Sequence, residues 1–214
     1  NDMVLWVVLN VCGRAKISDK NNSGENRIEG IPATVSDGRY GVDNDNYNSG
    51  TMEYISLRHG GTVIGADNEI NGVTFGGVGR ETVFNNIEVF ATKDDGIEFF
   101  GGTVNFKYAY LTGNQDDSFD YTNGWRGKAQ WVIIDQDNPD PATATGNAPD
   151  NGMEFDSNSK APNATPRSNP TISNFLVIGN TVKHGELVHL RAGTSATLVN
   201  GIIVDKSNLG PCIE

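Results

Sequence analysis

The chain repeats itself roughly every 21–25 residues, and this repeat limits the possible folds more than any other feature. Residues 82–102, 103–127 and 169–193 align with one another, and residues 49–81 form a longer, earlier copy. Each unit contains short runs of alternating apolar and polar residues, separated by turns rich in Gly, Asn and Asp. Such a unit cannot bury its apolar face alone, so successive units must stack, with strands about 4.8 Å apart.

This repeat predicts an all-β fold, a single-stranded right-handed parallel β-helix of about six coils with loop insertions. Leucine-rich repeats have a similar length, but Leu is scarce here and their consensus is absent. Gly and Asn contribute 26 and 25 of the 214 residues. Both tolerate positive φ and favour turns, which argues against long helices.

The regularity of the repeat divides the chain into two expected parts. Residues 1–48 are less regular and are predicted to form an N-terminal cap and a first coil, whereas residues 49–214 form the β-helix repeats. Polar insertions at 137–149 and 156–169, rich in Pro, Ala, Thr, Asn and Ser, interrupt the coils. Such loops either build the walls of a groove on one face or decorate the surface.

The net charge of −11 excludes several partners. An acidic chain is a poor ligand for nucleic acid or for an anionic membrane surface. We also expect no membrane insertion, because no apolar run approaches the ~18 residues that a spanning helix needs. A low charged fraction of 20% predicts a secreted or cell-surface protein. Uncapped coils at the ends of a solenoid predict end-to-end self-association.

Three strings within the repeats are distinctive: GADNEINGVTFGGVG, KDDGIEFFGGTVNFKY and QDDSFDYTNGWRGKAQ. They resemble a group of secreted bacterial β-helix proteins of the pectate-lyase-like type, mostly known as lipoproteins, surface-anchored proteins or proteins without an assigned activity. The resemblance covers residues 49–205 and implies a right-handed parallel β-helix of exported origin. It implies no particular reaction.

Stacking the repeats in this register places acidic residues in columns. One column contains Asp95, Asp117, Asn151 and Glu186; a second contains Glu98, Asp120, Glu154 and His189; a third contains Asp94, Asp116, Asp150 and Gly185. Residues 94–158 carry nine of the eleven net negative charges. Like charges about 4.8 Å apart repel by ~3–4 kcal/mol at an effective dielectric constant of 20. The columns therefore require solvent screening, protonation or a bound cation.

A calcium site is one way to relieve this repulsion. Ca²⁺ takes six to eight oxygen ligands in flexible geometry, whereas the chain has too few Cys and His residues for a zinc site. The predicted ligands are Asp94, Asp95, Glu98, Asp116, Asp117 and Asn151. The alternative is a solvated acidic face in which Asp side chains accept hydrogen bonds from turn amides.

The second column suggests catalytic residues, namely Asp120, Glu154 and His189. Paired carboxyl groups on neighbouring coils suit a glycosidase, and a His general base suits an ester or lactone hydrolase. A polyuronate lyase would need a basic side chain from among Arg126, Lys128 and Arg191. Two functions remain open. One is an extracellular calcium-dependent hydrolase acting on carbohydrate or another ester-like small molecule. The other is a non-catalytic, calcium-stabilised surface, adhesion or carbohydrate-binding module.

Aromatic residues concentrate in coils 82–134, and alternation predicts that most of them stack in the core. They are Phe99, Phe100, Tyr108, Tyr110, Phe119, Tyr121, Trp125 and Trp131. Trp125 lies in the turn 123–127, outside the alternation. The pattern therefore makes Trp125 a candidate for stacking against a sugar.

Overall fold

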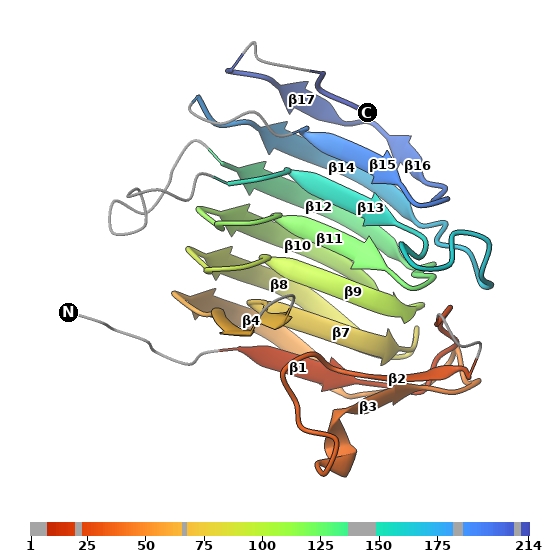
Figure 1. Cartoon of the computed structure of the whole chain (residues 1–214). Helices are drawn as coiled ribbons and strands as arrows, with labels where there is room; N and C mark the ends of the chain where they lie inside the picture. Colours follow the sequence, from red (N-terminus) through yellow and green to blue (C-terminus); the bar gives the residue numbers. More distant parts are fainter. Residues whose placement is uncertain (1–7, 20–22, 66–67, 137–148, 182–185, 208–210) are drawn as a thin grey trace.

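The computed structural model describes residues 8–19, 23–65, 68–136, 149–181, 186–207 and 211–214, without the side chains of 62–69. The described chain coils through two sheets of parallel strands, and its one helical segment is a short 3-10 turn at Ser36–Gly38 (Figure 1). The predicted all-β class and parallel β-helix are confirmed. Most of the predicted insertion at 137–149 lies outside the described residues.

The first sheet contains one short strand from each coil. Its order is β1 (Leu9–Cys12), β7 (Val73–Val78), β9 (Ile97–Gly102), β11 (Phe119–Thr122), β13 (Met153–Asp156) and β15 (Val188–Arg191). All neighbouring pairs are parallel.

The second sheet is built from longer strands. These are β4 (Thr51–Arg58), β8 (Val83–Phe90), β10 (Asn105–Thr112), β12 (Lys128–Asp135) and β14 (Thr171–Ile178), and β14 pairs with both β16 (Thr197–Val199) and β17 (Ile202–Val204). Two antiparallel hairpins join β2 (Glu25–Arg27) to β3 (Arg39–Gly41) and β5 (Thr62–Gly65) to β6 (Asn68–Ile70).

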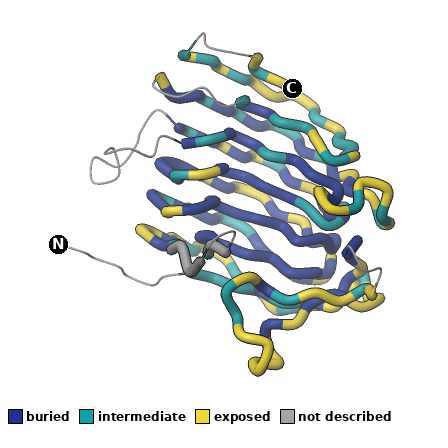
Figure 2. Tube along the Cα trace, in the orientation of Figure 1, coloured by how far each residue is buried: buried dark blue, intermediate teal, exposed yellow. Residues whose placement is uncertain are grey.

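The core lies between the two sheets, where alternation directs every second side chain inward. Phe75 and Phe99 stack with ring centroids 5.0 Å apart, and Phe106 from the second sheet stacks on Phe99 at 5.4 Å. Burial is most complete in the middle coils (Figure 2). A continuous stack of this kind gains dispersion and hydrophobic energy from each added coil.

The prediction of an exposed Trp125 is wrong. Its side chain is fully buried and lies 4.4 Å from the Phe99 ring, and its Nε1 donates a hydrogen bond to the Val104 carbonyl. The turn directs the indole ring into the core, because burying so large an apolar ring is more favourable than exposing it. Conversely, Tyr108, Tyr110 and Trp131 are not in the core but lie on the surface.

Each of the five long strands of the second sheet turns a corner at its fourth residue. Tyr54, Asn86, Tyr108, Trp131 and Asn174 all have φ between 56° and 63° at this position. Asn200, between β16 and β17, continues the ladder with φ 55°. These residues have no pairing partner in the neighbouring strands. Each adopts the left-handed αL backbone conformation and bends its strand at the same place in every coil.

Residues 13–19 and 23–48, which we call the strap, lie against the outer face of the first sheet. Backbone hydrogen bonds join Ala15 to Gly77, Lys16 to Gly102 and Ser18 to Asn123, so residues 15–18 cross the ends of β7, β9 and β11 in turn. The strap then returns through the β2–β3 hairpin. A small apolar cluster fastens it to the sheet, and its members are Ile17, Ile28, Tyr40 and Phe100.

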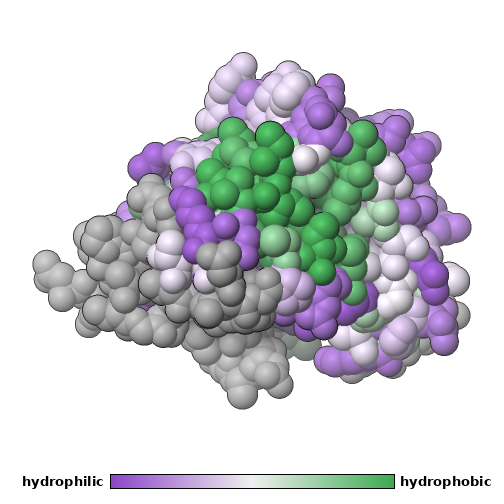
Figure 3. Space-filling model, turned by 90° about the horizontal axis from the view of Figure 1, so that it is seen from above, coloured by the Kyte–Doolittle hydropathy of each residue, from purple (hydrophilic) through white to green (hydrophobic). Residues whose placement is uncertain are grey.

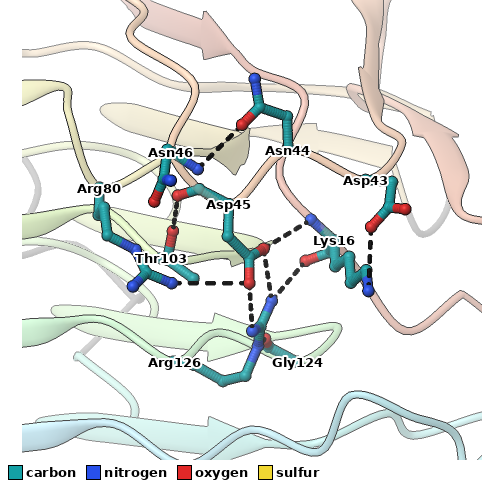
Figure 4. A network of polar contacts seen from close by, with 9 residues as sticks. All are labelled: Lys16, Asp43, Asn44, Asp45, Asn46, Arg80, Thr103, Gly124 and Arg126. Atoms are coloured by element: carbon teal, nitrogen blue, oxygen red, sulfur yellow. Dashed lines mark hydrogen bonds and ion pairs between the residues drawn. The ribbon is translucent and has the colours of Figure 1, made fainter.

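A polar network also anchors the strap to the coils (Figure 4). Asp45 accepts two hydrogen bonds from the Arg126 guanidinium, at 2.8 and 3.0 Å, and one from the Lys16 amide at 3.1 Å. Its backbone carbonyl accepts a further bond from Thr103 Oγ1. Burial raises the pKa of Asp45, but the bonds and charge of Arg126 outweigh it and hold that pKa below its usual value.

The last two strands and the segment after them expose apolar side chains, namely Val199, Ile202, Val204 and Ile213. Figure 3 views the molecule from above, the side on which β17 lies in Figure 1, and shows a hydrophobic area there. The predicted end-to-end self-association stays a prediction. No helix among the described residues is long and apolar enough to cross a membrane.

Candidate functional site

The strap and the first sheet enclose a polar cleft of about 360 Å³. Its floor is the outward-facing row of the sheet, and its walls are the strap on one side and residues 158–160 on the other. The titratable side chains that line it are Asp19, Glu25, Arg27, Glu29, Tyr40, Glu98, Asp120, Glu154, Asp156, Lys160 and Arg191. The cleft is therefore predominantly acidic, with three basic side chains.

Three members of the second predicted column, Glu98, Asp120 and Glu154, lie on the floor of the cleft, and the column is in register. Asp120 pairs with Glu98 on one side and with Glu154 on the other, and Glu154 pairs with His189. Parallel pairing without a shift places these four side chains on the same face of adjacent strands. The structure thus brings together the three predicted catalytic residues, Asp120, Glu154 and His189.

The first predicted column is also in register, and its side chains bond from coil to coil. Asp95 Oδ1 accepts the Asp117 amide at 3.0 Å, and Asp117 Oδ1 accepts the Asn151 amide at 2.7 Å. These bonds are the amide-capping role that we expected from an acidic turn column. They involve one oxygen of each of the two carboxylates.

Burial dominates the electrostatics of the first two acidic columns. Asp95, Glu98 and Asp120 are each only 8% exposed. Burial raises the pKa of all three well above the usual range, and the neighbouring carboxylates raise them further. The pKa of Asp117 is raised in the same way, by burial and then by Glu154. Glu98 and Asp120 hydrogen-bond each other, which requires a shared proton.

Glu154 has a different environment from Asp120. Its Oε2 lies 2.6 Å from Arg191 Nη2, and its Oε1 accepts a hydrogen bond from Asn151 Nδ2 at 3.2 Å. His189 Nδ1 lies 3.7 Å from the same Oε1. Burial raises the pKa of Glu154 above its usual value; Arg191 and His189 act to lower it, but they do not outweigh the burial and the neighbouring Asp156. Glu154 therefore differs from Asp120 in its direct ion pair with Arg191, which favours the ionised form of the Glu154 carboxyl group.

Arg191 is the basic residue of the cleft floor. Its Nε also donates to Asp156 Oδ1 at 2.8 Å, so the guanidinium bridges two carboxylates of β13. The other two basic residues considered for a lyase lie elsewhere. Arg126 belongs to the strap anchor, and Lys128 begins β12 in the second sheet.

Two groups of three carboxylates are close enough to share a cation. Oxygens of Asp95, Glu98 and Asp120 lie within 4.8 Å of one another, and so do oxygens of Asp94, Asp95 and Asp116. Ca²⁺ binds oxygens at 2.3–2.6 Å, so its ligands lie up to roughly 5 Å apart. Asp120 Oδ1 is buried without a hydrogen-bond partner, which fits a missing ligand to that oxygen.

The first group changes the role that the sequence predicts for Asp120. The sequence predicts that Asp120 acts on the substrate while Asp95 and Glu98 bind a metal. In the structure the carboxylate oxygens of all three lie within 4.8 Å of one another, so one ion could bind all three. Of the other expected ligands, Asp94 and Asp116 join Asp95 in the second group, whereas Asp117 belongs to neither. The groups contain acidic residues alone, so the expected role of Asn151 stays a prediction. The metal and catalytic assignments therefore stay predictions, and they compete for Asp120.

Comparison with known proteins agrees with this architecture. A family model described as a pectate-lyase like beta helix domain matches residues 3–213. The chain belongs to this family. Searches of curated proteins and of solved structures gave no match. Membership of the pectate-lyase-like family indicates a carbohydrate-related function.

The sequence reasoning missed several cleft residues. Asp156 follows Glu154 by two positions, so alternation was a sufficient signal that it shares the outward face. Asn71, whose Nδ2 donates to Glu98, comes one coil before Asp95 and extends the first column. Tyr40 had no such signal, because it reaches the cleft from the strap and not from the repeat.

Proposed function

We propose that the protein hydrolyses glycosidic bonds of an extracellular carbohydrate in the cleft. One observation carries the proposal: two carboxyl groups on adjacent coils have opposite surroundings. Asp120 is buried and shares a proton with Glu98, whereas Glu154 is paired with Arg191. A protonated and an ionised carboxyl group facing one substrate are what glycoside hydrolysis requires.

The roles of the residues follow from these surroundings. Asp120 donates its proton to the leaving glycosidic oxygen, and Glu98 keeps that proton in place until substrate binds. Glu154, ionised beside Arg191 and Asn151, acts as the base or nucleophile. His189 and Arg191 position the Glu154 carboxylate, and the strap excludes water from the floor of the cleft.

The test is the release of reducing ends from a panel of polysaccharides in buffer containing EDTA. Asp120→Asn and Glu154→Gln are each expected to lower the rate by roughly 10²–10⁴-fold, the usual contribution of a general acid or base. Glu53→Gln, which makes the same chemical change on the exposed outer face of β4, is the matched control and retains full activity. An unsaturated uronide product, or full activity in both cleft variants, would contradict hydrolysis by this pair.

A second candidate function rests on the group formed by Asp95, Glu98 and Asp120. In this proposal Ca²⁺ binds the three carboxylates, neutralises their repulsion and stabilises a non-catalytic surface or binding module. A carboxyl group that coordinates the ion gives up its proton, so Asp120 cannot then be the acid. Calcium and proton donation by Asp120 are therefore alternatives.

Thermal melts distinguish the two candidates. Calcium binding predicts that millimolar Ca²⁺ raises the melting temperature by several degrees relative to EDTA, that Mg²⁺ does not, and that Glu98→Gln abolishes the rise. The hydrolase proposal predicts that Ca²⁺ either has no effect on turnover or inhibits it. Turnover that requires Ca²⁺ and survives Asp120→Asn would reject Asp120 as the acid and favour a calcium-dependent hydrolase.

A further inference from the structure

A second surface with binding chemistry lies on the outer face of the second sheet, away from the cleft. The residues with positive φ at the bend of each long strand, together with the strand segments that follow them, line an open groove of about 770 Å³. Its exposed apolar and aromatic side chains are Tyr54, Tyr108, Tyr110, Trp131, Ile133 and Ile202. We call it the aromatic groove. None of the strap residues lines it.

The aromatic residues at the corner are unfavourable for the fold. Asn adopts positive φ several-fold more readily than bulky side chains, and the chain uses Asn at three steps of this ladder, Asn86, Asn174 and Asn200. At the other three steps it has Tyr54, Tyr108 and Trp131. The structure could therefore be built with Asn throughout, and the aromatic residues add backbone strain.

Burial does not compensate for this strain. The side chains of Tyr54, Tyr108 and Trp131 are 83%, 51% and 48% exposed, although large aromatic residues normally gain their stability from burial. Strained, exposed residues on a rigid sheet are the arrangement found where a ligand makes contact. On adjacent coils, Tyr108 and Trp131 repeat at the strand spacing of about 4.8 Å, which suits a ligand that is itself a linear repeat.

The charges of the groove limit what binds there. Among the described residues that line the groove, the one carboxylate is Glu88, and it is paired with Arg58 at 2.6 Å. The groove is therefore a neutral strip on a chain of net charge −11. A polyanion would be repelled by the chain, and a second copy would bring a further −11 close by. A neutral polymer meets neither repulsion. Aromatic faces interleaved with Asn amides match the alternation of apolar ring faces and hydroxyl groups in a sugar chain.

We propose that the aromatic groove is a non-catalytic binding site for a neutral polysaccharide, with Tyr108 and Trp131 as its central contacts. It is separate from the cleft, so it holds a glycan whether or not the cleft is an enzyme site. Its position on the opposite sheet leaves the cleft free while the polymer is bound.

The test uses the full chain in affinity gels containing hydroxyethyl cellulose, xylan or galactomannan, and in sedimentation with microcrystalline cellulose or chitin. The variant is Tyr108→Asn/Trp131→Asn, which installs the residue already present elsewhere on the ladder. Val35→Asn, at another exposed apolar residue located in the strap, is the matched control. Melting temperature and sedimentation velocity are measured for each protein.

The expected result is retention of the wild type and of the control by at least one neutral polysaccharide. Binding weakens at least tenfold in the double variant, whose melting temperature is unchanged or higher. The cleft variant Asp120→Asn is expected to bind like the wild type, which separates this site from the proposed hydrolase. Three outcomes would overturn the proposal: no retention by any of the polymers, equal retention of the double variant, or a wild-type dimer that the variant dissociates.

Discussion

The two outer faces of this solenoid are built by the same alternation, yet they have opposite properties. On the first sheet, outward-facing Glu98 and Asp120 are 8% exposed, and they line a cleft whose wall is formed by the strap. On the second sheet, outward-facing Tyr108 and Trp131 are about half exposed because the described chain leaves that face open. On these two outer faces, therefore, carboxyl groups are buried and aromatic side chains are exposed, the reverse of the usual distribution.

The comparison shows that strand alternation separates inside from outside but does not decide burial. Burial of an outward side chain depends on what a distant segment of the chain lays over it. The cover converts an acidic row into a desolvated site whose carboxyl groups have raised pKa values. Both outer faces are therefore candidates for function, catalysis on the first sheet and binding on the second. The following predictions test the contrast between them.

The largest effect is expected from two tryptophans only six positions apart. Trp125→Ala removes a fully buried ring and should cost about 3–5 kcal/mol, which lowers the melting temperature by roughly 6–20 °C. Trp131→Ala removes a half-exposed ring from a left-handed position and should change the melting temperature by less than about 2 °C. Similar losses in both variants would show that Trp131 also serves the core.

Removing the contact between Asp45 and Arg126 should loosen the strap and expose the outer face of the first sheet, as the outer face of the second sheet already is. Asp45→Ala deletes both bonds to Arg126 and should cost about 2 kcal/mol, as expected for charge-assisted hydrogen bonds in a partly buried site. Asp43→Ala, which breaks the exposed pair with Lys16, is the control and should cost less than about 0.5 kcal/mol. Urea unfolding measures both, and proteolysis within the strap of Asp45→Ala alone would confirm that the cover has loosened.

The buried carboxyl groups predict an unusual pH dependence of stability in EDTA. Their pKa values are higher in the folded chain than the usual ~4 of the unfolded chain, so the folded state binds more protons above pH ~4. Stability should therefore fall as the pH rises from about 5 towards 8, by a few degrees in melting temperature. Asp45 has the opposite sign: its lowered pKa adds stability above pH ~4 that is lost in acid.

A double variant tests the origin of this slope. Glu98→Gln/Asp120→Asn removes two of the titrating groups and should flatten the curve between pH 5 and 8. A wild-type melting temperature that is constant or rises over this range in EDTA would contradict the raised pKa values.

The smallest effect is expected on the open face. Glu88 accepts hydrogen bonds from Ser56 and Arg58, and these contacts lower its pKa, but the pair is exposed to solvent. Glu88→Gln should change the free energy of unfolding by less than about 1 kcal/mol, and less still at high salt. Urea titrations at low and high ionic strength measure this. A larger loss would mean that the open face is covered in solution.

The repeat was sufficient to predict the fold and the column that pairs Glu98, Asp120, Glu154 and His189, because stacked coils allow one register that keeps every apolar row inside. The repeat also indicated that residues of the same column lie next to one another on successive coils. It was not sufficient for Trp125, since a turn residue lies outside the alternation and its direction is set by the space available beneath the coil.

The sequence alone therefore specified the solenoid and the rows of side chains on its faces, because both follow from local periodicity. The tertiary structure specified which row is buried. The strap reaches the first sheet through long-range contacts such as Asp45 with Arg126, 81 positions apart, and no periodic signal encodes them. Desolvation, and with it the chemistry of Asp120 and Glu154, depends on that cover.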